Sequence, residues 1–160
     1  MHGDFYRRVV PSPEPRRILG LEAIHILVEA GVVVICAGGG GVPVLLTEGG
    51  GIRGVEAVID KDLTAALLAE SLDAQGLVML TDVAAVFAGW GTPDARAIRL
   101  ASPRQLRAMR FTPGSMLPKV EAACRFVEHT GRWAAIGALE EGIAVLEGRA
   151  GTMVRADDGP

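Results

Sequence analysis

The sequence predicts an α/β fold in which a mostly parallel, open sheet is flanked by helices. Short apolar segments typical of buried strands alternate with helical segments, and the links between them are short. Of the 160 residues, 49% are hydrophobic but only 4% are aromatic. A core of small and branched side chains favours helices packed on a sheet over an aromatic-rich β-sandwich. This length suffices for one domain with a sizeable core, so residues 1–160 are interpreted as a single domain.

The charge and hydropathy patterns narrow the classes of partner. The net charge is −3, with 16 basic and 19 acidic residues in mixed order, so no basic stripe predicts nucleic-acid binding. The longest apolar runs are too short to span a membrane, and the first four residues contain no apolar signal region. Cys36 lies in a strand-like run and Cys124 on an apolar helix face, which predicts reduced core thiols in a cytoplasmic protein.

The first part of the chain predicts an extended lead-in, one helix and one buried strand. Three alternating prolines between positions 11 and 15 exclude a helix there. After the prolines, a stripe of apolar residues at helical spacing predicts a helix that ends at Gly31. The run Val32–Cys36 is apolar throughout and mostly β-branched, which is typical of a strand covered on both faces. The residues of the helical stripe are Leu21, Ile24, Leu27 and Val28.

Four consecutive glycines follow this predicted strand. They are Gly38, Gly39, Gly40 and Gly41. A dinucleotide-binding turn is rejected, because Val42–Leu46 is not the amphipathic helix that such a turn requires. The glycines still allow close approach of a ligand or another strand. Residues 47–51 predict the tip of a hairpin that returns through Ile52.

Charged residues stand at the start of the next helix. Residues 55–59 predict a strand or an extended entry, and residues 63–70 a helix. Asp62 is placed to cap that helix. Lys61 between two aspartates is also a charge cluster that could position a phosphate.

Polar residues at the carboxyl ends of predicted strands are candidate ligand contacts, because ligands bind there in open α/β sheets. Residues 77–80 predict a buried strand that ends at Thr81 and Asp82. The remaining predicted elements are a loop at 89–94, helices at 102–109 and 140–146, and strands at 134–136 and 152–154.

Residues 112–119 lead into the most regular predicted helix. The helix carries a periodic apolar face and stops at Gly131. Free backbone N–H groups at its start, together with Lys119, predict an anion site suited to phosphate. The alternative is an ordinary capped helix whose lysine is solvated. The apolar face consists of Val120, Ala123, Cys124 and Val127.

Five sequence blocks, in order along nearly the whole chain, resemble carbamate kinases of the amino acid kinase family. They are Arg8–Pro13, Gly38–Val44, Gly54–Leu63, Leu80–Val83 and Pro113–Ala122. The resemblance implies a three-layer αβα sandwich with a mostly parallel open sheet, of which this chain is the carboxyl-terminal, nucleotide-binding half. It also implies the reaction ATP + carbamate ⇌ ADP + carbamoyl phosphate with Mg²⁺, and a place in arginine metabolism.

The same resemblance implies roles for individual residues. Lys61 and Lys119 would neutralise charge on the transferred phosphoryl group, with Asp62 holding both lysines. The nucleotide would contact Thr81, Asp82, Val83, Gly114, Ser115 and Met116, and the glycines 38–41 would face the centre of the active site. The resemblance implies no metal ligand among these residues.

The chain departs from the family's pattern in three ways. Leu117 replaces a usual glycine, and Ala84-Ala85 replaces an Asp-Gly pair, which would alter a turn if a positive φ is needed there. The family's amino-terminal half, with its first phosphate loop and most of its dimer surface, is missing from this sequence. Three hypotheses follow: a carbamate kinase, a nucleotide-binding module or half-enzyme that needs a partner chain or homodimer, and a kinase for another carboxylate. The Asp60–Asp62 and Pro113–Met116 blocks argue against the third.

Overall fold

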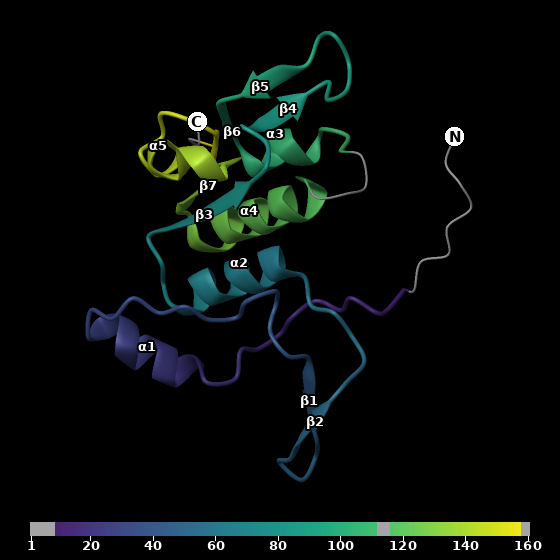
Figure 1. Cartoon of the computed structure of the whole chain (residues 1–160), viewed down its shortest axis with the longest axis vertical. Coiled ribbons are helices and arrows are strands. Elements are labelled where there is room, and N and C mark those ends of the chain that lie inside the picture. Colours follow the sequence, from purple (N-terminus) through teal and green to yellow (C-terminus); the bar gives the residue numbers. More distant parts are fainter. Residues whose placement is uncertain (1–8, 112–115, 158–160) are drawn as a thin grey trace.

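The computed structural model describes residues 9–111 and 116–157. Its main sheet has four strands in the order β3 (Gly76–Thr81), β7 (Trp133–Ala138), β8 (Thr152–Val154) and β6 (Leu100–Ala101). The pairs β3–β7 and β6–β8 are parallel, whereas β7–β8 is antiparallel. The predicted α/β class with a mostly parallel sheet is therefore confirmed (Figure 1).

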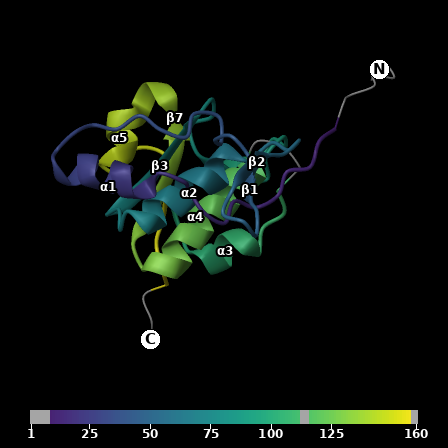
Figure 2. The same ribbon diagram turned by 90° about the horizontal axis from the view of Figure 1, so that it is seen from below.

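Helices lie on both faces of this sheet. Figure 2 shows α2 (Lys61–Ser71), α3 (Pro103–Arg107) and α4 (Met116–Thr130) on one face, and α5 (Gly142–Leu146) on the other. A short 3₁₀ helix, η1 (Leu139–Glu141), connects β7 to α5. The helical layer containing α2 and α4 is the thicker one, and among the described α-helices α5 covers part of the opposite face.

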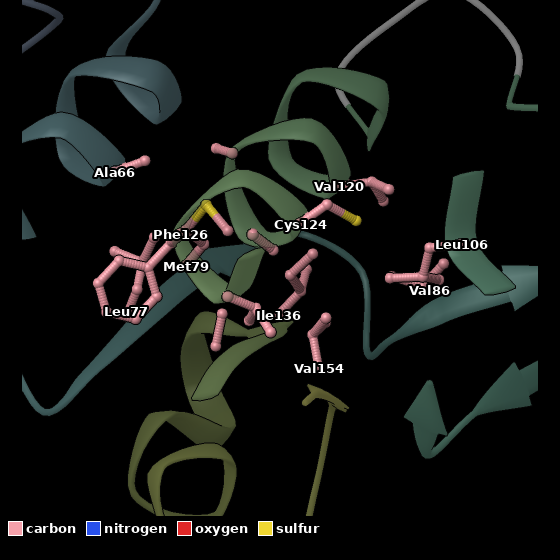
Figure 3. Close-up of a cluster of buried hydrophobic side chains, with 14 of the residues drawn as sticks. Ala66, Leu77, Met79, Val86, Leu106, Val120, Cys124, Phe126, Ile136 and Val154 are labelled. Atoms are coloured by element: carbon pink, nitrogen blue, oxygen red, sulfur yellow. The ribbon is translucent and has the colours of Figure 1, made fainter. Parts of the chain in front are cut away.

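The core lies between the sheet and the α2–α4 layer. Strand β3 alternates, so that Leu77 and Met79 are buried toward the helices. The predicted apolar face of α4 is buried with at most 3% exposure of any of its four residues. Phe126 is completely buried beside it (Figure 3). Burial raises the pKa of the Cys124 thiol to about 11, and Cys124 is a free core thiol, as predicted. Cys36 is also a free thiol but is only half-buried, so its predicted place in the core is wrong.

Three smaller elements lie outside the main sheet. Helix α1 (Leu21–Glu29) precedes Gly31 as predicted, and strands β1 (Val44–Leu46) and β2 (Ile52–Gly54) form the expected hairpin around the tip at 47–51. A second hairpin, β4 (Val86–Ala88) with β5 (Arg96–Ile98), flanks the predicted loop at 89–94 but was not itself predicted.

One prediction about the sheet is wrong. Residues Val32–Cys36 form no strand, and Val33 and Ile35 are 91% and 98% exposed. An apolar β-branched run needs neighbouring strands to complete its hydrogen bonds, and none of the described strands lies against it. Residues 55–59 adopt the extended alternative rather than a strand. Within the described residues, none of the helices has the length and hydropathy to cross a membrane.

Candidate active site

The first turn of α2 is capped by Asp60 rather than by Asp62. The Asp60 Oδ1 atom accepts hydrogen bonds from the backbone N–H of Asp62 at 2.8 Å and of Leu63 at 3.2 Å. Helix α2 therefore begins at Lys61, two residues before the predicted start. The prediction that Asp62 caps the helix is wrong, because its carboxylate points toward α4 instead.

Asp62 and Lys119 form a buried ion pair between α2 and α4. The Lys119 Nζ atom donates a hydrogen bond to Asp62 Oδ2 at 2.9 Å, and the two side chains are only 6% and 9% exposed. A charge removed from water this far needs a partner of opposite sign, which each supplies to the other. Lys61 Nζ lies 3.7 Å from the same oxygen but is 60% exposed. One carboxylate thus holds two ammonium groups, one inside and one at the surface.

The fold explains why these residues meet although Asp62 and Lys119 are 57 positions apart. Helices α2 and α4 each precede one strand of the parallel pair β3–β7 and pack beside each other (Figure 1). A helix that connects parallel strands runs antiparallel to them, so both helix N-termini lie at the carboxyl end of the sheet. That end also carries the positive poles of the two helix dipoles.

The glycine loop packs against the start of α2. Gly40 is buried, and a Cβ atom added to it would lie 2.1 Å from the carbonyl oxygen of Ile59. The Thr64 hydroxyl hydrogen-bonds with the Gly40 carbonyl oxygen at 3.0 Å and the Asp60 carbonyl oxygen at 3.1 Å. The close backbone approach predicted for the glycines is therefore made by this chain's own segment before Lys61. Thr64 was missed as a positioning residue, since a threonine inside a helix carries no signal in sequence, and Asp60 was predicted as part of the charge cluster but not as the cap.

Thr81, Asp82 and Val83 lie where β3 ends, at the same end of the sheet. The Thr81 hydroxyl donates to Asp82 Oδ1 at 3.0 Å, and Asp82 is exposed. Among the described residues, these three make no hydrogen bond or ion pair with either lysine. Neither Ala84 nor Ala85 has a positive φ, so the alanines that replace the family's Asp-Gly pair leave this turn unstrained.

Two of the predicted nucleotide contacts, Gly114 and Ser115, lie outside the described residues. Met116 is the first residue of α4 and packs partly buried against the hydrophobic core. The described part of the chain holds no cluster of three or more metal-ligating side chains. Lys61, Asp62, Lys119 and the glycine loop are thus the predicted residues that the structure brings together.

A family model described as the amino acid kinase family matches residues 2–137. The chain belongs to the amino acid kinase family. Carbamate kinase from Haemophilus influenzae is 51% identical over 152 residues, which cover 95% of this chain and 49% of that protein. Carbamate kinase from Escherichia coli O6:H1 is 55% identical, again over 95% of this chain and 50% of that protein. This amino acid kinase family member therefore spans about half the length of the curated relatives it matches.

A solved structure agrees with this assignment. Carbamate kinase from Giardia lamblia bound to AMP-PNP superposes with a TM-score of 0.89 at 38% sequence identity. The match covers 93% of this chain and 53% of that protein. The chain is thus similar to part of a carbamate kinase in both sequence and fold.

Proposed function

We propose that this chain carries the nucleotide-side half of a carbamate kinase site, which transfers a phosphoryl group between ATP and carbamate. The observation that supports it is the cluster of Lys61, Asp62 and Lys119 at the carboxyl end of the sheet. The similarity to carbamate kinases, one of them bound to AMP-PNP, supplies the substrate class. A cytoplasmic location and a role in arginine metabolism belong to the same proposal.

The chemistry fits this set of side chains. In the direction of ATP formation, an oxygen of the ADP β-phosphate attacks the phosphorus of carbamoyl phosphate. The P–O bond to the carbamoyl group breaks, and carbamate leaves with the electron pair. Such a reaction needs alignment and positive charge more than a protein nucleophile. Lys119 and Lys61 would stabilise the spread negative charge, while Asp62 fixes Lys119 and the positive poles of the two helix dipoles lie at the same end of the sheet.

Mg²⁺ would arrive with the nucleotide rather than occupy a protein cage. The described residues contain no cluster of three or more metal ligands, and Asp62 already faces two ammonium groups. Mg²⁺ commonly keeps several waters and uses phosphate oxygens with only one or two carboxylates. Asp82, exposed at the end of β3, is a carboxylate that could contact such an ion. When bound, the ion would neutralise phosphate charge.

The alternative is a nucleotide-binding module, or one subunit of a split enzyme, that does not turn over alone. The chain spans about half the length of the curated relatives it matches, so turnover by this chain alone is itself part of what the experiment tests. Both readings place ADP at the same helix N-termini, so binding and turnover must be measured separately.

The test mixes the purified chain with ADP, Mg²⁺ and carbamoyl phosphate and follows ATP. ATP formation that falls at least 100-fold in Lys119→Ala, as expected when a group that stabilises the transition state is removed, would support the enzyme. Lys61→Ala is the second variant, since this exposed side chain can be removed without opening the buried pair. Arg155→Ala, an exposed cation beyond β8, is the matched control and should leave the rate unchanged.

Calorimetry with ADP·Mg²⁺ separates the two readings. ADP binding without ATP formation, weakened by Lys61→Ala but not by Arg155→Ala, would support the module. No ADP binding by a chain that circular dichroism shows to be folded would overturn both.

A further inference from the structure

The glycine loop, residues 38–41, contacts the start of α2 through Gly40. A Cβ atom added to Gly40 would lie 2.1 Å from the Ile59 carbonyl oxygen and 3.5 Å from the Lys61 backbone nitrogen. A Cβ atom added to any of the other three glycines would have no neighbouring atom within 4 Å. These three glycines are exposed, whereas Gly40 is buried. Of the four glycines, Gly40 is therefore the one that packs on α2.

The backbone at the entry to this loop is strained. Ala37 has a φ of +62°, in the left-handed region that residues with a Cβ atom rarely adopt. The Gly38 N–H donates to the Cys36 carbonyl oxygen at 2.8 Å. The Gly40 N–H donates to the Ala37 carbonyl oxygen at 2.9 Å. Strain of this kind persists where surrounding contacts hold the backbone, so the loop needs a contact outside itself.

The side chain of Thr64 supplies this contact. Thr64 lies near the start of α2 and is only 3% exposed. Its hydroxyl oxygen lies 3.0 Å from the Gly40 carbonyl oxygen, and within the described part of the chain no other group donates to that carbonyl. A buried carbonyl that loses its partner costs more free energy than the hydrogen bond itself contributes. The Thr64 hydroxyl therefore stabilises the loop in its place against α2.

The same hydroxyl has a second acceptor within its own helix. It lies 3.1 Å from the Asp60 carbonyl oxygen, which already accepts the Thr64 backbone N–H at 3.0 Å. A threonine hydroxyl has one proton, so it makes one full hydrogen bond at a time. That proton belongs with Gly40 while the loop is in contact, because the Asp60 carbonyl is already paired. When the loop moves away, the hydroxyl can turn to Asp60 and stay paired, so the contact is reversible.

This contact lies next to Lys61. Lys61 is the first residue of α2 and its side chain is 60% exposed, whereas Lys119 is held in the interior at 2.9 Å from Asp62. Burial thus fixes Lys119 but not Lys61. The position of Lys61 depends on the backbone at the start of α2, which is the backbone that Gly40 packs against. The loop and Lys61 are therefore positioned together.

We propose that Thr64 is a positioning residue for the phosphoryl-transfer site. Its hydrogen bond to Gly40 holds the glycine loop beside Lys61 and so sets the affinity for the substrate that brings the transferred phosphoryl group. The inference rests on the proposed function, in which Lys61 contacts that group. In the direction of ATP formation the group arrives on carbamoyl phosphate, and ADP does not carry it. Loss of the Thr64 hydroxyl should therefore weaken the binding of carbamoyl phosphate more than that of ADP.

Thr64→Val is the variant that tests this, because valine keeps the volume of the side chain and removes the hydroxyl. The side-chain cap from Asp60 stays in place, so α2 should still form. We expect amide hydrogen exchange in residues 37–41 of the full chain to accelerate at least about 5-fold, the equivalent of one hydrogen bond. Calorimetry should show carbamoyl phosphate bound at least about 5-fold more weakly. The affinity for ADP·Mg²⁺ should change by no more than roughly 2-fold, because the charge of Lys61 and the end of β3 are retained.

Thr64→Ser and Ser71→Ala are the matched controls. Thr64→Ser keeps the hydroxyl and should hold both exchange and affinity within roughly 2-fold of the parent chain. Ser71 lies on the same helix, and its exposed hydroxyl donates to the Leu67 carbonyl oxygen at 2.7 Å. Ser71→Ala thus removes a hydroxyl hydrogen bond within α2 without touching the loop, and it should change neither readout.

Unchanged exchange at residues 37–41 in a folded Thr64→Val chain would overturn the inference, because something else would then hold the loop. Equal weakening of carbamoyl phosphate and ADP binding would do the same, by showing that Thr64 supports only the fold. A parent chain that binds ADP but not carbamoyl phosphate would also overturn it and leave nucleotide binding intact. A parent chain that binds neither ligand would overturn the proposed function, and accelerated exchange in Thr64→Val would still support the hydrogen bond to Gly40.

Discussion

Gly40 is the glycine of the loop at which we expect substitution to be least tolerated. A Cβ atom there would lie 2.1 Å from the Ile59 carbonyl oxygen, and its φ of +128° is one that side chains rarely adopt. We expect Gly40→Ala to lower the free energy of unfolding by about 3 kcal/mol, from strain and displacement of the α2 entry. Urea unfolding followed by circular dichroism measures this difference.

Gly39→Ala is the matched control for that change. Nothing lies within 4 Å of a Cβ atom built on Gly39. Its unfolding free energy should therefore change by no more than about 0.5 kcal/mol. Equal losses in the two variants would show that the loop does not pack against Ile59 as described.

Residue roles in the site were only partly predictable from the sequence. Charge density around Lys61 predicted a local cluster and the family resemblance added Lys119 to it; in the structure Lys61, Asp62 and Lys119 lie together. Sequence position cannot reveal that Lys119 is buried, because its partner stands 57 residues away on another helix. Two aspartates flank Lys61, and the choice of cap between them depends on which one α4 engages.

The Asp60 cap at the N-terminus of α2 can be tested separately from the Asp62–Lys119 ion pair. Asp60→Ala removes the acceptor of two backbone N–H groups, so we expect a loss of about 1 kcal/mol in the unfolding free energy. Asp60→Asn retains a capping oxygen and should stay within a few tenths of a kcal/mol of the parent chain. Thermal unfolding of the three proteins makes the comparison. A loss in Asp60→Asn as large as in Asp60→Ala would assign the effect to charge and not to capping.

Most helices and strands whose apolar side chains pack within this chain were predicted correctly from the sequence. Helices α2 and α4 and strands β3, β7 and β8 all occur, because their apolar side chains meet a surface that this chain can cover. Helix α1 also occurs where it was predicted, although none of its residues is buried. The segment Val32–Cys36 has the clearest strand pattern and forms no strand, since its partners are not among the described strands. The hairpin β4–β5 was missed because its three-residue strands are too short to show alternation.

At the scale of the whole molecule, the large exposed surface predicts a smaller heat-capacity change on unfolding than an ordinary domain of this size shows. The unfolded chain of 16.7 kDa would expose about 24,200 Å². The folded chain exposes 11275 Å², so folding removes roughly 53% of that surface, against about 69% for an ordinary domain of this size. The heat-capacity change scales with the surface exposed on unfolding.

An ordinary domain of 160 residues would show a heat-capacity change of about 2.2 kcal/mol/K. For this chain alone we expect about 1.7 kcal/mol/K, because the ratio of the two buried fractions is roughly 0.77. Scanning calorimetry at several pH values, on samples that light scattering shows to be monomeric, measures it. A monomer with the full value would mean that the apolar side chains exposed here, such as Val33, Ile35 and Ile143, are covered in solution by the chain itself.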